Sequence, residues 1–264
     1  MLSIVYTYLK EMSRWVKQFI YGVLYLGIAS LVVYGLAASG VFSAATCFDN
    51  RQNQKEEEID CGGPCVACAI KKLQPIRSEV QTFGIDGNTN VVLILSNPNL
   101  TYGASSFNYT INFYDQAGGK IFSLTKNSFI YPAEAPKMII EPNLRFNPSS
   151  VSGSPEVIIE NLEWRPAAEF GQPRTQARQV QIQTANRQAS VTGIIANRES
   201  FGLTRVSVGA ILINKTTRVP VGASKTVLLD IRPFEERAFK ISAPLSVALK
   251  VSDLDILLTI EARR

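Results

Sequence analysis

Two stretches about 100 residues apart decide the fold: Val91-Val92-Leu93-Ile94-Leu95-Ser96-Asn97 and Val191-Thr192-Gly193-Ile194-Ile195-Ala196-Asn197. Each is a short apolar run that ends at an asparagine, which is typical of a buried β-strand followed by a turn. Downstream, each is followed by a turn that contains Pro and Glu, then by another apolar strand; these turns are Pro132 to Lys137 and Pro233 to Arg237. This order of strands and turns occurs twice, which predicts an internal repeat.

Other segments alternate in the same strand-like way. Gln179-Val180-Gln181-Ile182-Gln183 alternates strictly, and Ile256, Leu258 and Ile260 do so near the end of the chain. The stretch from Arg165 to Arg178 contains two prolines and a glycine, as a linker would. We therefore expect a mainly β protein with two tandem β-sandwich domains, residues 76–165 and 176–264. Shared strand spacing alone could produce the repeat, and the expectation of two domains would remain.

The first repeat also contains motifs with a family resemblance: Asn97-Pro98-Asn99, Tyr102-Gly103-Ala104, and Ile111-Asn112-Phe113-Tyr114-Asp115 with Gly118-Gly119 behind it. In these motifs it resembles the immunoglobulin-like domains of the late-embryogenesis-abundant type and the related FxLYD domains. The second repeat departs from the pattern, because Arg198 replaces the proline after Asn197 and Leu212-Ile213-Asn214 replaces the Tyr-Asp ending. The resemblance implies immunoglobulin-like β-sandwiches with a binding or structural role, and it supplies no catalytic residues.

An uncharged, largely apolar stretch of 24 residues runs from Phe19 to Phe42. As a helix it would be about 36 Å long, enough to cross a hydrocarbon core of about 30 Å. We therefore expect a transmembrane helix at residues 19–42. Basic residues precede it and acidic residues follow it, so the positive-inside rule places residues 1–18 in the cytoplasm and the later domains outside. The alternative is a signal peptide cleaved near Ser43-Ala44-Ala45.

Two patterns near this stretch bear on self-association. An apolar seam with alternating spacings of three and four residues would run along one side of an N-terminal helix: Leu2, Val5, Leu9, Met12, Val16 and Phe19. Gly35 and Ser39 form a small-xxx-small pair that lets two membrane helices approach closely. The seam is too short to establish a coiled coil, and a helix lying on the inner leaflet explains it equally well. Self-association is an open expectation.

All four cysteines lie within 22 residues, at Cys47, Cys61, Cys65 and Cys68. An even number beside an extracytoplasmic membrane surface predicts two disulfides, with all pairings open. A Cys₄ zinc site is the alternative, but only Cys65-x-x-Cys68 has proper ligand spacing. Residues 47–68 resemble a small cysteine-rich module of secreted and surface proteins, with the pattern Cys-x-Asp…Asp-Cys-Gly-Gly-x-Cys-x-x-Cys.

The cysteine segment also carries four oxygen-bearing side chains, Asp49, Asn53, Glu56 and Asp60. Hard oxygen ligands of this kind suit Ca²⁺, and disulfides would tether the loop that presents them. The spacing is not that of an EF-hand loop, and acidic side chains beside a membrane are often simply solvated. Calcium is the one cofactor that the sequence suggests.

Composition argues against several function classes. The chain has no histidine, which excludes His-based triads and His metal ligands, and no Gly-rich phosphate loop or nucleophile elbow occurs. An enzyme is not expected. The best candidate for catalytic residues would be the carboxylate pair Asp253 and Asp255. Residues 47–173 hold 10 Lys/Arg and 14 Asp/Glu, net −4, and residues 174–264 hold 14 and 7, net +7. The basic excess fits either a solvated face or a surface for an acidic partner, such as an envelope polymer, a lipid headgroup or the acidic half of a neighbouring molecule.

We therefore expect a non-enzymatic, single-pass envelope or surface protein of the cell membrane that presents two β-sandwich binding domains for adhesion or assembly. Its expected partners are the membrane and a protein or envelope polymer. Nucleic acid is not expected, because the compartment disfavours it and no aromatic-basic signature occurs. The alternative function is an accessory subunit of a membrane secretion, pilus or transport complex.

Overall fold

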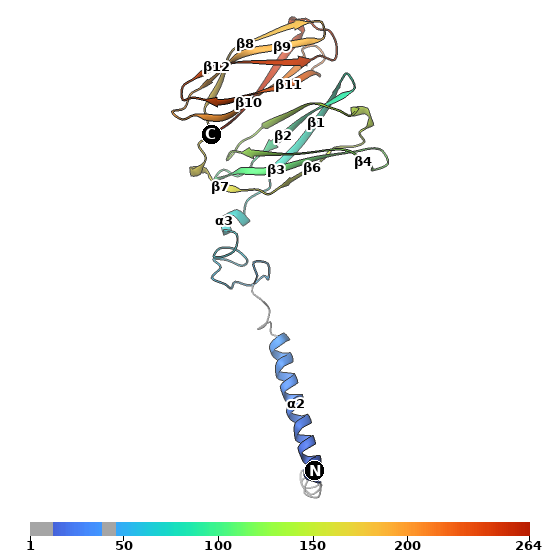
Figure 1. Cartoon of the computed structure of the whole chain (residues 1–264), viewed down its shortest axis with the longest axis vertical. Helices are drawn as coiled ribbons and strands as arrows, with labels where there is room; N and C mark the ends of the chain where they lie inside the picture. Colours follow the sequence, from blue (N-terminus) through green and yellow to red (C-terminus); the bar gives the residue numbers. More distant parts are fainter. Residues whose placement is uncertain (1–12, 39–45) are drawn as a thin grey trace. The chain divides into compact units, whose positions relative to one another are not determined.

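A computed structural model describes residues 13–38 and 46–264 (Figure 1). The chain divides into two compact units, residues 1–72 and 73–264. The first unit contains the long helix α2 (Arg14–Ala38), the cysteine segment and the short helix α3 (Cys68–Lys71). The second unit contains all thirteen named strands, so the expectation of a mainly β protein is confirmed.

Helix α2 has 25 residues and is long and apolar enough to cross a membrane, a property that signal sequences share. It begins at Arg14, five residues before the expected start at Phe19, because Arg14 and Lys17 are good helix formers and do not interrupt the backbone hydrogen bonds. Residues 39–42 of the expected span lie outside the described residues, as do Ser39 of the small-residue pair and Leu2, Val5, Leu9 and Met12 of the seam.

The first half of the β-rich unit forms two antiparallel sheets. One has the strand order β1-β2-β5, with β1 at Arg77–Ile85, β2 at Asn88–Ser96 and β5 at Lys137–Leu144. The other has the order β4-β3-β6, with β4 at Lys120–Ile130, β3 at Tyr102–Tyr114 and β6 at Glu156–Glu160; β7 (Trp164–Pro166) also pairs with β3. Two 3₁₀ turns, η1 (Pro148–Ser150) and η2 (Ala167–Glu169), lie in the connections.

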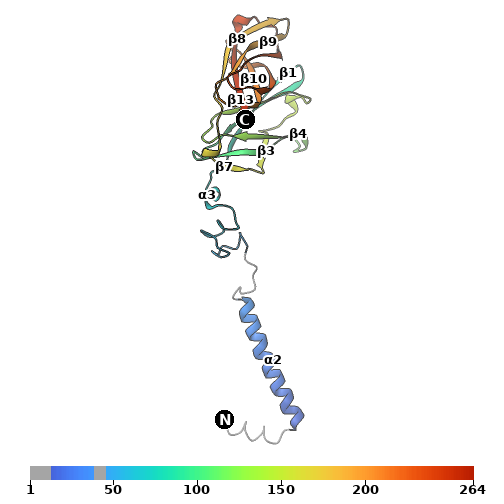
Figure 2. The ribbon, with the colours of Figure 1, turned by 60° about the vertical axis from the view of Figure 1, so that its left-hand side comes forward.

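The second half forms two further antiparallel sheets. One has the order β12-β9-β8, with β12 at Glu236–Pro244, β9 at Gln188–Asn197 and β8 at Thr175–Ala185. The other has the order β11-β10-β13, with β11 at Pro220–Ile231, β10 at Leu203–Asn214 and β13 at Leu254–Arg263, which follows the 3₁₀ turn η3 (Val251–Asp253). In Figures 1 and 2 the sheets of β8 to β13 pack against those of β1 to β7.

Each half has its own hydrophobic cluster, and one central strand contributes most to each. From β3, four alternate side chains are essentially unexposed: Phe107, Tyr109, Ile111 and Phe113. From β10, the same spacing buries Val206, Val208, Ala210 and Leu212. Alternate residues of a strand share one face, and fully burying a large apolar side chain contributes about 1.5–3 kcal/mol. The alternation therefore determines which faces of the sheets meet.

The asparagines that end the two repeated stretches make the same hydrogen bonds. Asn97 Nδ2 donates to the carbonyl oxygens of Tyr102 and Tyr131, at 2.8 and 2.9 Å. Asn197 Nδ2 donates to the carbonyl oxygens of Phe201 and Arg232, also at 2.8 and 2.9 Å. In both turns the amide oxygen accepts from the backbone N–H two residues further on. A buried side-chain amide thus joins three backbone segments in each half, which explains why asparagine recurs.

A third hydrophobic cluster joins the halves, formed by Val92, Ile140, Ile211 and Ala223. Gly209 of β10 lies at this contact, where an added Cβ would come within 2.6 Å of Ile140 Cδ1 and would also collide with Thr259. Any side chain at this position would force Thr259 or Ile140 to move. The interface explains why residues 73–264 form one compact unit.

Candidate functional site

The cysteine segment contains two disulfides, Cys47–Cys65 and Cys61–Cys68, with Cα–Cα distances of 5.5 and 4.9 Å. These are the pairings that the sequence left open, and they leave no cysteine of the chain free. A sulfur in a disulfide cannot serve as a thiolate ligand, so this arrangement excludes the Cys₄ zinc site. Few apolar side chains are buried here, and the bridges supply the constraint.

The structure brings the four expected calcium ligands into one hydrogen-bonded loop. Asp49 accepts from Asn53 Nδ2 at 2.8 Å, and this hydrogen bond lowers the pKa of Asp49. Glu56 is buried and accepts from the backbone N–H groups of Asn53 and Asp60, at 3.1 and 3.2 Å. Asp60 in turn accepts from the backbone of Asn50 at 3.0 Å. The carboxylates thus already bind amide hydrogens.

Two oxygens of this set lack a proton donor among the described residues, while other oxygens of Asp49, Glu56 and Asp60 accept hydrogen bonds. Asn53 Oδ1 is buried without a hydrogen-bond partner among the described residues. Glu56 Oε1 lies 3.1 Å from Cys65 Sγ, which carries no proton because it is in a disulfide. Calcium takes six to eight oxygen ligands. An ion here would have to displace several of these hydrogen bonds, and calcium binding stays a prediction.

Asp253 and Asp255 each have local partners. Asp255 forms an ion pair with Arg218 at 2.8 Å. Asp253 accepts from Ser252 Oγ at 2.9 Å and from the backbone of Lys250 at 3.3 Å, within a turn. Each carboxylate thus has hydrogen-bond or ion-pair partners of its own.

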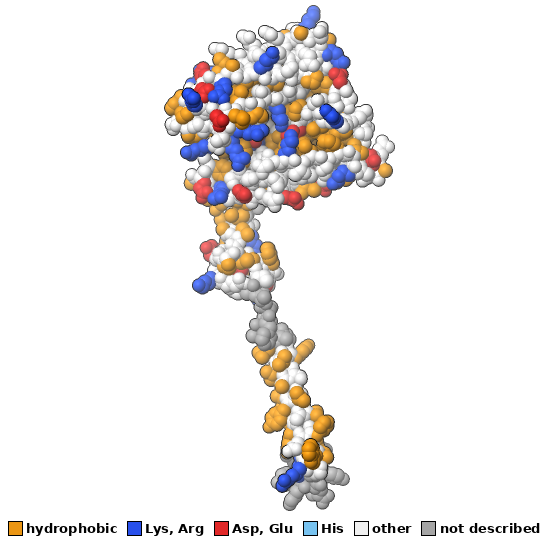
Figure 3. All heavy atoms as spheres, viewed as in Figure 1, with side chains coloured by type: hydrophobic (Ala, Val, Ile, Leu, Met, Phe, Trp, Pro, Cys, Tyr) orange, Lys and Arg blue, Asp and Glu red, His pale blue; other side chains and the backbone are white. Residues whose placement is uncertain are grey.

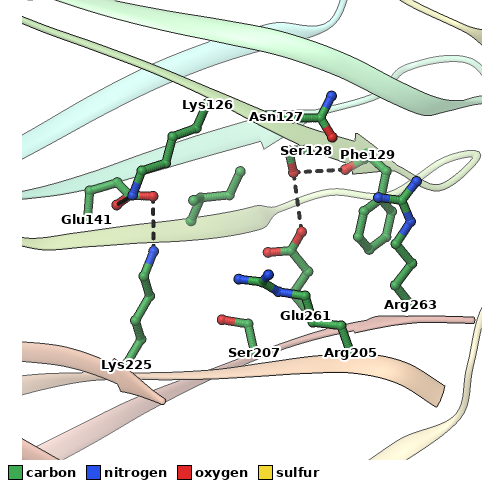
Figure 4. Close-up of a pocket in the computed structure, with 11 residues that line it drawn as sticks. Lys126, Asn127, Ser128, Phe129, Glu141, Arg205, Ser207, Lys225, Glu261 and Arg263 are labelled. Carbon is green, nitrogen blue, oxygen red and sulfur yellow. Dashed lines mark hydrogen bonds and ion pairs between the residues drawn. The ribbon is translucent and has the colours of Figure 1, made fainter. Parts of the chain in front are cut away.

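The candidate site that the structure adds is a cleft of about 400 Å³ between the two halves of the β-rich unit (Figure 4). We call it the interhalf cleft. Residues of β4 and β5 form one side of it, and residues of β10, β11 and β13 form the other. Its lining consists of Lys126, Asn127, Ser128, Phe129, Ile139, Glu141, Arg205, Ser207, Lys225, Glu261 and Arg263.

Glu141 is the most buried carboxylate of the cleft, with a side chain 3% exposed. It accepts from Tyr109 at 2.9 Å and from Lys225 at 3.0 Å, and it also pairs with Lys126. Burial by itself raises the pKa of Glu141, but the hydrogen bonds and charges of the two lysines outweigh burial and hold that pKa below its usual value. Glu141 is therefore ionised at neutral pH, and both of its carboxylate oxygens have partners within the protein.

Glu261, the other carboxylate, is also engaged. Ser128 donates to it at 3.2 Å, and Lys137 Nζ lies 3.1 Å from its Oε1 atom. The Lys137 side chain is 3% exposed, and its ammonium lies 3.6 Å from the centre of the Phe129 ring. Lys137 Nζ lies outside hydrogen-bond geometry, so charge attraction and the aromatic face hold it in place.

Two guanidinium groups complete the cleft. Arg263 donates to the carbonyl oxygen of Ser105 at 3.3 Å and lies 5.5 Å from the centre of the Phe129 ring. Arg205 is exposed and makes no side-chain hydrogen bond or ion pair within residues 13–38 and 46–264. Figure 3 shows Lys and Arg side chains gathered across the middle of the β-rich unit. The potential in the cleft is therefore positive.

No motif marks the interhalf cleft in the sequence, because its residues come from five strands. The one relevant signal in the sequence is the charge difference between the halves. Ion pairs between the halves neutralise part of that difference. Glu141 of the acidic half pairs with Lys225 of the basic half, and Asp86 pairs with Arg187. Part of the charge of the basic half is thus balanced within the same chain, and an external acidic partner stays a prediction.

Comparison with known proteins adds no family: no family model matches the chain, and no curated protein matches it.

Proposed function

We propose that this chain is a non-enzymatic surface protein, held in the membrane by α2, that presents its β-rich unit outside the cytoplasm for adhesion or assembly. The observation that carries the proposal is the exposure of α2. No residue of the window Arg14–Leu36 is buried, although the helix is almost wholly apolar. Such a surface is unfavourable in water and favourable in lipid, where a helix satisfies its own backbone hydrogen bonds.

The cysteine segment supports the same topology. Disulfides persist in oxidising compartments, and both lie on the C-terminal side of α2. Arg14 and Lys17 lie at the other end of the helix, which favours a cytoplasmic N-terminus.

We further propose that the β-rich unit is a pair of tandem immunoglobulin-like sandwiches. The equivalent hydrogen bonds of Asn97 and Asn197 support this, as does the presence of one hydrophobic cluster in each half. A sandwich of this kind offers sheet faces and loops to a partner and needs no catalytic group.

The test is membrane extraction of the full chain carrying different tags at its two ends. Both tags should stay together in the pellet after an alkaline wash, and external protease should remove only the C-terminal tag. The variant Leu26→Arg with Ile28→Arg should release the chain, because each central charge costs about 2.5–3.5 kcal/mol in a membrane helix. Leu100→Arg is the matched control, since Leu100 is exposed outside α2. Loss of the N-terminal tag from the mature chain would instead identify a cleaved signal peptide.

A further inference from the structure

We propose that the interhalf cleft binds an oxyanion, a carboxylate or a phosphate group, with Arg205 as its principal ligand. This inference goes beyond the proposed function, because it depends on residues 73–264 alone and not on the anchoring of α2.

The cleft has more cationic than anionic side chains. The charged residues that line the cleft are four cations and two carboxylates: Lys126, Lys225, Arg205 and Arg263 with Glu141 and Glu261. Glu141 takes up Lys126 and Lys225, and Glu261 takes up Lys137. The two guanidinium groups remain without a carboxylate within 4.0 Å in the part of the chain that the structure describes. An anion is the ligand that completes this balance.

The guanidinium group of Arg205 is well suited to bind an oxyanion. A guanidinium presents a planar fork of N–H donors that matches the two oxygens of a carboxylate or phosphate. Arg205 and Ser207 are alternate residues of β10, so they share one face of the strand. Figure 4 shows both rising from that strand toward the cleft. A bound oxyanion can thus accept from the guanidinium and from the hydroxyl of Ser207.

The side chains around Arg205 are held in place by other contacts. Arg263 is fixed by the Ser105 carbonyl and the Phe129 ring, and Lys137 lies against the same ring. Lys126 and Lys225 are both fixed on Glu141. The ordering cost of binding therefore falls mainly on the side chain of Arg205, because its neighbours are already held in place. A volume of about 400 Å³ falls within the range of small-molecule sites and suits a sugar acid or a phosphorylated sugar.

Binding is tested by isothermal titration of the full chain in neutral detergent, with inorganic phosphate in one series and glucuronate in another. Sodium chloride at matched ionic strength is the control ligand. We expect saturable binding of at least one oxyanion. Arg205→Gln should weaken it by at least about tenfold, the effect of losing a charge-assisted hydrogen bond. Arg205→Lys should fall between, because it keeps the charge and loses the fork.

The matched control variant is Arg145→Gln, which removes an exposed arginine outside the cleft and should leave binding unchanged. Saturation by phosphate alone identifies a phosphate site, and saturation by glucuronate alone identifies a carboxylate site. Ser207→Ala gives an independent check through the second donor and should weaken binding several-fold. The proposal is overturned if neither oxyanion saturates the chain, if chloride competes equally, or if Arg145→Gln weakens binding as much as Arg205→Gln.

Discussion

The cysteine segment and the β-rich unit are stabilised by different forces. Among residues 46–72 the buried apolar side chains are Cys61 and Cys68, while Phe48 is 88% exposed and Ile59 is 53% exposed. In residues 73–264, two large hydrophobic clusters and a third one between them bury most of the apolar side chains. Covalent bonds therefore replace burial in the smaller segment, as they do in small disulfide-rich domains. Its structure should respond to redox conditions, and that of the β-rich unit should not.

The largest effect is expected from a cavity in the β-rich unit. Phe107 is fully buried in the first hydrophobic cluster, so Phe107→Ala should reduce the free energy of unfolding by about 3–5 kcal/mol. Denaturant unfolding followed by circular dichroism measures this. Leu100→Ala, at a residue 75% exposed, should change stability by less than about 0.5 kcal/mol. Equal effects of the two variants would show that burial at β3 does not stabilise the unit.

The second effect should be confined to the cysteine segment. Cys47→Ser combined with Cys65→Ser removes the bridge with a sequence separation of 18, which contributes about 3 kcal/mol by loop closure. Limited proteolysis should then cut within residues 46–72, while the unfolding of residues 73–264 stays unchanged. A matched drop in the stability of the β-rich unit would contradict the independence of the two regions.

Thiol labelling tests directly whether the four cysteines form disulfides. The denatured wild-type chain should show no reactive thiol before reduction and four after it, because all four cysteines are paired. Any thiol reactive before reduction would argue against these pairings.

The smallest effect concerns the polar part of the β-rich unit and depends on pH. The folded-state pKa of Glu141 lies below its ordinary value of 4.5, so its contribution to stability is present above pH 4.5 and is lost as pH falls through the folded pKa. Glu141→Gln should cost about 1–2 kcal/mol at pH 7 and should reduce the loss of stability on acidification below pH 4.5. Denaturant unfolding at several pH values measures both. Glu160→Gln, at an exposed residue, should leave the wild-type profile unchanged.

The strands were predictable where burial and alternation coincide. The apolar runs ending at Asn97 and Asn197 lie in β2 and β9, and the alternating segments near Val180 and Leu258 lie in β8 and β13. A long apolar helix near the N-terminus was predictable, but its start was not, because hydropathy marks the apolar stretch and not the first hydrogen-bonded turn. The disulfide pairing was beyond reach, since a count of cysteines leaves the connectivity open.

The interhalf cleft could not be predicted, because Lys126, Arg205 and Glu261 meet only after the two halves pack together. Each residue alone looks like an ordinary charged side chain on a strand. The charge difference between the halves was visible, but the sequence could not show that Lys225 is paired with Glu141 within the same chain.

The close approach at Gly209 has a mechanical consequence. Because β10 lies against Ile140 with no side chain at Gly209 between them, the two halves are in direct packed contact and are not joined by the connecting segment alone. A pull applied to the C-terminal half is shared between this contact and the chain segment that joins the halves. In a single-molecule force experiment, a bulkier residue at this position should therefore lower the force at which the two halves separate.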